Sequence, residues 1–152
     1  MKMKQFILLT LLLLIFFAPM SFSQTKNKDI SETIIALEKG ALEKWNQGDP
    51  SGYLNLSAED VTYFDPATEQ RLDGLDNLRK YYKPMEGQIN VSKYEMLNPK
   101  VTAMNDMAVL TFSLHSYKED KVFKWNCTEV YRLGSNGQWK IIHTHWSFFT
   151  KP

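Results

Sequence analysis

The sequence predicts an α+β domain in which three helices precede a long antiparallel sheet. Between residues 29 and 83, apolar residues recur at three- and four-residue steps, which is the spacing of one helix face. From residue 89 onward β-branched and aromatic residues dominate, and turn signals separate four stretches. Helices grouped ahead of strands are typical of α+β domains.

The first predicted helix lies between Asp29 and Gly48 and is amphipathic. Its apolar stripe consists of Ile30, Ile34, Leu37, Ala41 and Trp45. Its polar face is expected to hold Glu38, Lys39, Glu43 and Lys44. Asp29 and Glu32 have the spacing of a capping box, and a glycine such as Gly48 commonly ends a helix.

Two shorter helices and one strand follow. Asp49-Pro50 predicts a helix start with aspartate as the cap and proline in the first position. A strand is expected at Val61 to Asp65, where Pro66 closes it. Asp73 is the expected cap of a third helix, whose apolar stripe is Leu75, Leu78 and Tyr82 and which Pro84 ends.

Four long strands are predicted in the remainder of the chain. They cover Ile89–Met104, Met107–Tyr117, Val122–Leu133 and Trp139–Phe149, with turns at Asn105-Asp106, Lys118–Asp120 and Asn136-Gly137. Several of these strands are apolar on both faces, so both faces of the sheet need a cover. Three helices can cover one face, and we expect a second copy of the chain to cover the other in a homodimer.

Residues 1–23 have the pattern of a cleavable signal peptide. Lys2 and Lys4 precede an apolar run from Phe6 to Met20, and small residues at Ser21 and Ser23 favour a cut between Ser23 and Gln24. The alternative is a membrane anchor, for which the run is short. Cleavage predicts a secreted or periplasmic protein without membrane contact, formed by one domain of residues 24–152.

Charge and cysteine content exclude several classes of function. Residues 24–152 keep 16 basic and 17 acidic residues, so there is no positive surplus for nucleic acid. Cys127 is the single cysteine and cannot form an internal disulfide, which favours a buried free thiol. We predict no cofactor.

Two acidic residues are candidates for chemistry. Asp65 ends an apolar strand at "VTYFDP", where an aspartate either caps the turn or presents its carboxylate to a site. Glu129 lies in "WNCTEVYRL", on the same strand face as Trp125, Cys127 and Tyr131. A carboxyl in such surroundings pairs with a base such as Arg132, is exposed, or stays protonated with a raised pKa. The pattern alone favours pairing.

His143 and His145 lie about 7 Å apart on one strand face, a spacing at which both could bind one metal ion. The sequence supplies no evident third ligand, so no metal site is predicted. A triad of Ser147, His145 and Asp65 is disfavoured, because no strained elbow surrounds the serine.

The motifs "WNQGDP", "EDVTYFDP" and "GQWKIIHTHWS", with a third helix that begins at Gly74, resemble the nuclear transport factor 2-like superfamily over residues 29 to 149. Within it the chain looks closest to the SnoaL-like group and to the association domains of calcium/calmodulin-dependent kinases. The resemblance implies a cone-shaped, strongly bent antiparallel sheet wrapped on three helices, with a pocket at the open end and frequent dimers.

The ketosteroid isomerases of this superfamily give a partial match. The resemblance implies that Asp65 is a catalytic base, that Glu129 is a protonated acid in an oxyanion hole, and that Tyr82 and Trp146 support the pocket. The position of the principal oxyanion tyrosine falls on Ala41, which donates no hydrogen bond. Steroid isomerisation is therefore not expected, because losing one such donor costs about 3 kcal/mol.

The sequence favours a pocket for a small, largely apolar organic molecule, with Asp65 and Glu129 as candidates for proton transfer of the isomerase or cyclase type. Its expected walls are Tyr63, Tyr82, Trp125, Tyr131, Thr144 and Trp146. If Trp146 faces the pocket, strand alternation puts Ile142 and Thr144 beside it and turns His143, His145 and Ser147 outward. The alternatives are a non-catalytic assembly module and a metal-dependent hydrolase or dehydratase that uses the two histidines.

Overall fold

The computed structural model describes the backbone of residues 18–149 and the side-chain environment of residues 27–149. Its helices are α2 (Ala18–Asn46), α3 (Ser51–Leu56) and α4 (Leu75–Tyr82), followed by a 3₁₀ turn, η1 (Lys83–Met85). Its strands are β1 (Ser57–Phe64), β2 (Leu72–Asp73), β3 (Lys93–Met104), β4 (Met107–Lys118), β5 (Lys121–Leu133) and β6 (Trp139–Phe148).

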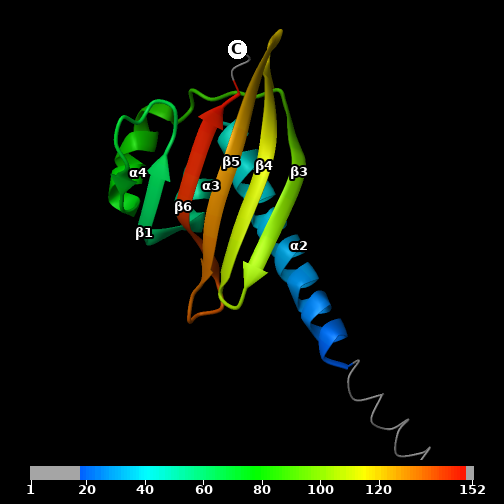
Figure 1. Cartoon of the computed structure of the whole chain (residues 1–152). Helices are drawn as coiled ribbons and strands as arrows, with labels where there is room; N and C mark the ends of the chain where they lie inside the picture. Colours follow the sequence, from blue (N-terminus) through cyan, green and yellow to red (C-terminus); the bar gives the residue numbers. More distant parts are fainter. Residues whose placement is uncertain (1–17, 150–152) are drawn as a thin grey trace, which may run out of the picture.

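The strands form one curved, unclosed sheet with the order β2-β1-β6-β5-β4-β3, and the helices pack on its concave face (Figure 1). This arrangement confirms the predicted α+β fold class. Strands β3 to β6 form the expected antiparallel meander. The sheet is not antiparallel throughout, because β1 pairs with β6 in the parallel direction. The two-residue strand β2 was not predicted.

Helix α2 begins eleven residues before the predicted cap. Asp29 lies inside the helix, where its carbonyl oxygen accepts a hydrogen bond from Thr33 Oγ1 at 2.8 Å, so the capping-box prediction was wrong. No glycine or proline lies between Pro19 and Asp29 to interrupt the helix. The helix ends as predicted, with Gly48 in the left-handed region at φ 79°.

Residue 38 corrects the predicted polar face of α2. Glu38 is fully buried, although it was expected to face solvent. It lies four residues from both Ile34 and Leu42, which are also fully buried, so it belongs to the stripe that faces the sheet. A carboxyl group therefore enters the core.

The two short helices begin close to where the sequence indicated. Asp49 Oδ1 accepts the backbone N–H of Ser51 at 2.8 Å, which fixes the start of α3. Asp73 is not the cap of α4. Gly74 takes that position with φ 86°, and Asp73 instead pairs with Arg71 at 2.6 Å.

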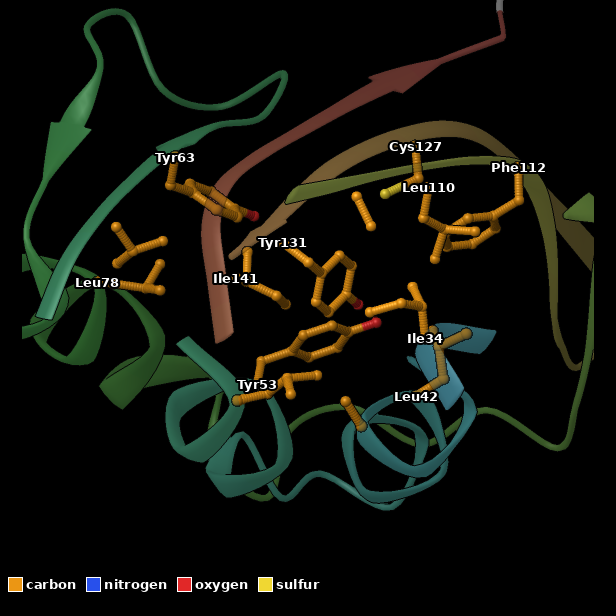
Figure 2. Packing of buried hydrophobic residues seen from close by; sticks show 14 of the residues in the cluster. Ile34, Leu42, Tyr53, Tyr63, Leu78, Leu110, Phe112, Cys127, Tyr131 and Ile141 are labelled. Carbon is orange, nitrogen blue, oxygen red and sulfur yellow. The ribbon is translucent and has the colours of Figure 1, made fainter. Parts of the chain in front are cut away.

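The core lies between the helices and the concave face of the sheet (Figure 2). Tyr53 of α3 and Tyr131 of β5 lie side by side there, with their hydroxyl groups directed to the same side, where Ile34 of α2 lies (Figure 2). Each sits in a largely apolar cluster, which also includes Leu42, Leu78, Leu110 and Ile141.

A β-bulge at Ile142 sets which side chains of β6 face the core. Tyr131 pairs with Ile141 and Val130 pairs with His143, so Ile142 is the extra residue. Ile141 and Thr144 are consequently buried, and the prediction that Ile142 stands beside Thr144 on the inner face was wrong.

The predicted signal peptide covers residues 1–23, of which 1–17 lie outside the described residues. Among the helices that are described, none is long and apolar enough to cross a membrane.

Candidate functional site

A cavity of about 470 Å³ opens between the helices and the concave face of the sheet. The end of α2, helix α4, the segment of residues 85–91 and the inner faces of β4, β5 and β6 all contribute to its wall. Aromatic side chains dominate the lining, which includes Trp45, Tyr53, Tyr63, Tyr82, Trp125 and Trp146. This size and composition are typical of sites for small organic ligands.

The aromatic rings pack against one another in two groups, in tilted and edge-to-face pairs. On the helical side, the Tyr82 ring lies 4.8 Å from that of Trp45 and 5.6 Å from that of Tyr63 between centroids. On the sheet side, Trp125 and Trp146 are 6.2 Å apart. Such contacts hold large side chains in fixed positions, so the walls are formed before a ligand arrives.

Asp65 follows β1 directly and lies on the cavity wall. Its Oδ1 accepts the backbone N–H groups of Ala67 and Thr68 at 2.8 and 3.0 Å. Its Oδ2 accepts the hydroxyl groups of Tyr63 and Tyr81 at 3.1 and 2.6 Å. Asp65 thus caps the turn and also presents its second oxygen beside two tyrosines of the cavity.

Glu129 is fully buried on the inner face of β5. Its Oε1 accepts a hydrogen bond from Thr144 Oγ1 at 3.2 Å, and its Oε2 lies 2.7 Å from the hydroxyl oxygen of Tyr131. The predicted pairing with a base was wrong, because Arg132 lies on the opposite face of the strand and pairs with Asp60 at 2.8 Å.

Glu38 of α2 completes a buried polar network. Its Oε1 accepts the hydroxyl group of Tyr53 at 2.7 Å, and its Oε2 lies 2.8 Å from the hydroxyl oxygen of Tyr131. The single proton of Tyr131 cannot serve both Glu38 and Glu129. One of these two contacts must therefore be donated by a protonated carboxyl group.

We assign this proton to Glu129. Burial, and then the negative charge of Glu38, raise the pKa of Glu129 well above its usual range. Its carboxyl group then donates to Tyr131, and Tyr131 donates to Glu38. Burial also raises the pKa of Tyr53 and of Tyr131, which keeps both hydroxyl groups protonated.

This network lies beneath the cavity rather than on its wall. Glu129, Tyr131 and Thr144 do not line the cavity, although all three were predicted at the site. Tyr53 connects the cavity to the buried polar network, because it lines the cavity and its hydroxyl group donates a hydrogen bond to Glu38. Cys127 lies nearby as the buried free thiol that was predicted, and burial raises its pKa.

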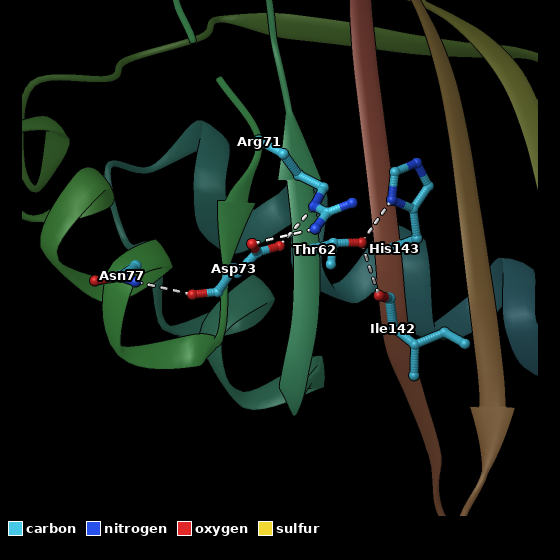
Figure 3. Close-up of polar contacts among 6 residues, drawn as sticks. All are labelled: Thr62, Arg71, Asp73, Asn77, Ile142 and His143. Carbon is cyan, nitrogen blue, oxygen red and sulfur yellow. Dashed lines mark hydrogen bonds and ion pairs between the residues drawn. The ribbon is translucent and has the colours of Figure 1, made fainter. Parts of the chain in front are cut away.

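The two histidines lie on the convex face of the sheet, away from the cavity. His143 Nδ1 lies 2.8 Å from Thr62 Oγ1 on β1 (Figure 3). His145 is exposed, with its ring 5.8 Å from that of Phe64. Partial burial lowers the pKa of His143. Within residues 27–149, no three side chains of the metal-binding types converge.

The structure places Asp65, Tyr63, Tyr82, Trp125 and Trp146 together at the cavity. Sequence reasoning missed Glu38, Tyr53, Tyr81 and Asn46. Of these, Glu38 had a detectable signal, because its spacing from Ile34 and Leu42 is that of the buried helix face.

The family model of the SnoaL-like domain matches residues 39–142, which span the end of α2 and nearly the whole sheet. This chain belongs to the SnoaL-like domain family. The predicted resemblance is thereby confirmed, and solved structures extend it. No curated protein gives a significant match.

A protein from Parabacteroides distasonis ATCC 8503, named provisionally as a ketosteroid isomerase, is 50% identical, with 80% of this chain and 89% of that chain covered and a TM-score of 0.74. An NTF2-like protein of unknown function from Pseudomonas putida KT2440 is 21% identical (82% and 98% covered, TM-score 0.72). The association domain of C. elegans CaMKII is also 21% identical (80% and 98%, 0.69). The last two likenesses establish the fold alone.

Proposed function

We propose that this SnoaL-like protein binds a small, largely apolar organic molecule in the aromatic cavity. The observation that carries the proposal is a pre-formed cavity of about 470 Å³ with an aspartate held among tyrosines on its wall. Aromatic faces suit a flat apolar ligand, and a few polar groups fix its orientation. The name of the relative that is 50% identical agrees with a small-molecule ligand.

Proton transfer is the chemistry that Asp65 supports. Oδ1 is occupied by two backbone N–H groups, whereas Oδ2 is held only by side-chain hydroxyl groups. A ligand proton reaches Oδ2 when Tyr81, which is only half-buried, gives up its hydrogen bond. A C–H bond beside a ligand carbonyl then breaks, the proton goes to Oδ2, and the electron pair forms an enolate that is later reprotonated.

Deuterium exchange tests this step. The protein in D₂O is expected to speed deuterium incorporation next to the carbonyl of a ketone such as 2-acetylnaphthalene, measured by mass spectrometry. Asp65→Asn should abolish the enhancement, because an amide does not accept the proton. Tyr81→Phe should increase it, because loss of a donor raises the proton affinity of the carboxylate.

The matched control is Asp76→Asn, which changes an exposed aspartate of α4 outside the cavity lining and should leave exchange unchanged. Equal exchange in wild type and Asp65→Asn would show that Asp65 only caps its turn. Binding of the ketone without exchange in any variant would leave a binding protein rather than an enzyme.

We also infer a homodimer formed through the convex face of the sheet. Val109 is 37% exposed there, and Phe64 and His145 lie on the same face in neighbouring strands. A second copy would bury this mixed apolar and polar face. Light scattering at micromolar concentration should give twice the monomer mass, and a monomer would refute the inference.

Export is proposed from residues 1–23, whose basic start, apolar run and small residues before Gln24 favour cleavage by a signal peptidase. N-terminal sequencing of the protein from the producing cells should begin at Gln24. An intact Met1 on a cell-associated protein would contradict export.

A further inference from the structure

Asn46 is the last residue of α2 and lines the cavity. The residue is buried, with a relative exposure of 7%. No group of the described chain accepts a hydrogen bond from its Nδ2 atom, and this is the one buried side-chain nitrogen or oxygen of the described residues in that condition. Buried amide groups normally find partners, because an unpaired donor costs about 1–3 kcal/mol.

The position of Asn46 is fixed from both sides. The backbone carbonyl oxygen of Asn46 accepts a hydrogen bond from the backbone N–H of Val91 at 3.0 Å. The backbone carbonyl oxygen of Gly48, two residues on, accepts one from the backbone N–H of Gly87 at 2.8 Å. These two bonds hold the segment of residues 87–91 against the end of α2. The backbone at Asn46, a residue of the cavity wall, is therefore tied to a second segment of that wall, which favours a fixed position for a binding residue.

The charges of the cavity define what the amide can bind. Asp65 and Lys118 are the charged residues among those that line it. Lys118 is the one basic residue among those that line the cavity, and it is exposed, whereas Asn46 is buried. An uncharged oxygen needs only a neutral donor.

We propose that Asn46 recognises the polar end of the ligand by donating from Nδ2 to an uncharged carbonyl-type oxygen. The ligand class is then a neutral molecule with an apolar, ring-sized body and a carbonyl group that is buried in the complex. This inference rests on the proposed binding function of the cavity. It assigns the carbonyl to the end of α2, away from the buried pair of Glu38 and Glu129.

The test compares probes of equal shape with and without the oxygen. Calorimetry gives the dissociation constants of 2-acetylnaphthalene and 2-isopropenylnaphthalene, and of acetophenone and α-methylstyrene, in which a C=CH₂ group replaces C=O. The alkene-to-ketone ratio of dissociation constants is compared between wild type and Asn46→Leu, so that differences in probe hydration cancel. The ratio should fall by about three- to tenfold in the variant, the value of one neutral hydrogen bond.

Two controls keep the result interpretable. Asn46→Leu should bind the alkenes as tightly as wild type, because leucine keeps the shape of the wall. Asn46→Asp, which removes the same two N–H groups without changing the shape, should lower the ratio as well. In ¹⁵N-labelled protein, the side-chain amide signal of Asn46 should shift with the ketone and not with the alkene.

The outcomes separate the two proposals. An unchanged ratio with all probes still bound would overturn the role of Asn46 and leave the binding cavity intact. Failure of wild type to bind any of the four probes would overturn the binding function, and the role of Asn46 with it.

Discussion

At the scale of single residues, one tyrosine hydroxyl group lies between two buried carboxyl groups. Tyr131 is 2.8 Å from Glu38 and 2.7 Å from Glu129, and only one proton is available on the hydroxyl group. The network is satisfied when Glu129 is protonated and Glu38 accepts from both tyrosines. A buried acid whose pKa is raised on folding makes stability depend on pH.

The pKa of Glu129 is raised in the folded protein, so the folded state holds a proton that the unfolded state has lost above the usual value of 4.5. Its contribution to stability is complete below that value and falls by about 1.4 kcal/mol per pH unit as pH rises toward the folded pKa. Glu129→Gln keeps the shape of the protonated acid, and its stability relative to wild type should increase from pH 5 to pH 8. Urea unfolding at several pH values measures this difference.

The control is Glu43→Gln, an exposed glutamate of α2 without a hydrogen-bond partner among the described residues. Its stability curve should run parallel to that of wild type. Parallel curves for Glu129→Gln as well would mean that Glu129 is ionised in the folded protein, and the proton count at Tyr131 would be wrong.

Single residues of the site were predictable only in part. Asp65 was found because it ends a strand, Tyr63 because aromatic residues are enriched, and Trp146 from the resemblance to ketosteroid isomerases. The buried network around Glu129 was not found, because Glu38 and Tyr53 join it from helices that lie 91 and 76 positions earlier in the chain. Such contacts depend on how the helices cross the sheet, which no local pattern contains.

At the scale of elements, Gly48 and Gly87 let the end of α2 approach the segment of residues 87–91 closely. Gly48 has φ 79°, and a Cβ atom there would lie 3.0 Å from the Cα of Gly87 and from the carbonyl oxygen of Ile89. Both the conformation and the space exclude a side chain. Gly40 lies within α2 and is exposed, and a Cβ atom added there would have no neighbour within 4 Å.

Gly48 and Gly40 give a matched pair of substitutions. Gly48→Ala should lower the free energy of unfolding by about 2 kcal/mol or more, because left-handed backbone alone costs about 1–2 kcal/mol and the segment at Gly87 must also move. Gly40→Ala should raise it by about 0.5–1 kcal/mol, the helix preference of alanine over glycine. Thermal and urea unfolding measure both, and equal effects would contradict the described end of α2.

Elements were predicted well where a sequence pattern extends over many residues. They were predicted poorly where a single residue determines a helix start or a strand register. The four meander strands differ from their predicted bounds by four residues or fewer, since each is long, rich in β-branched and aromatic residues, and separated from the next by turn signals. The bulge at Ile142 left no local signal, and it moved Ile141 rather than Ile142 to the inner face. The early start of α2 was missed because Asp29 resembles a cap inside a segment that has no helix breaker.

At the scale of the whole molecule, the curved sheet and the helices enclose an aromatic cavity. Its wall includes the unpaired amide of Asn46 and the carboxylate of Asp65. The cavity of about 470 Å³ is large enough for a ring-sized molecule, and residues of α2 and the end of β1 contribute to its wall. The central claim is that this cavity binds a ligand, rather than being a space that the curved sheet leaves without any binding function. Ser116 offers a direct handle, because it is buried and lines the cavity on β4, so a phenylalanine there would fill the space.

Native mass spectrometry of the protein from its producing cells, compared with Ser116→Phe, tests that claim most directly. We predict that wild type carries a noncovalent adduct of defined mass, which denaturation releases and which the filled variant lacks. Two results would contradict the account. One is a wild-type protein that carries no adduct and does not retain added 2-acetylnaphthalene. The other is an adduct that Ser116→Phe retains as well as wild type does.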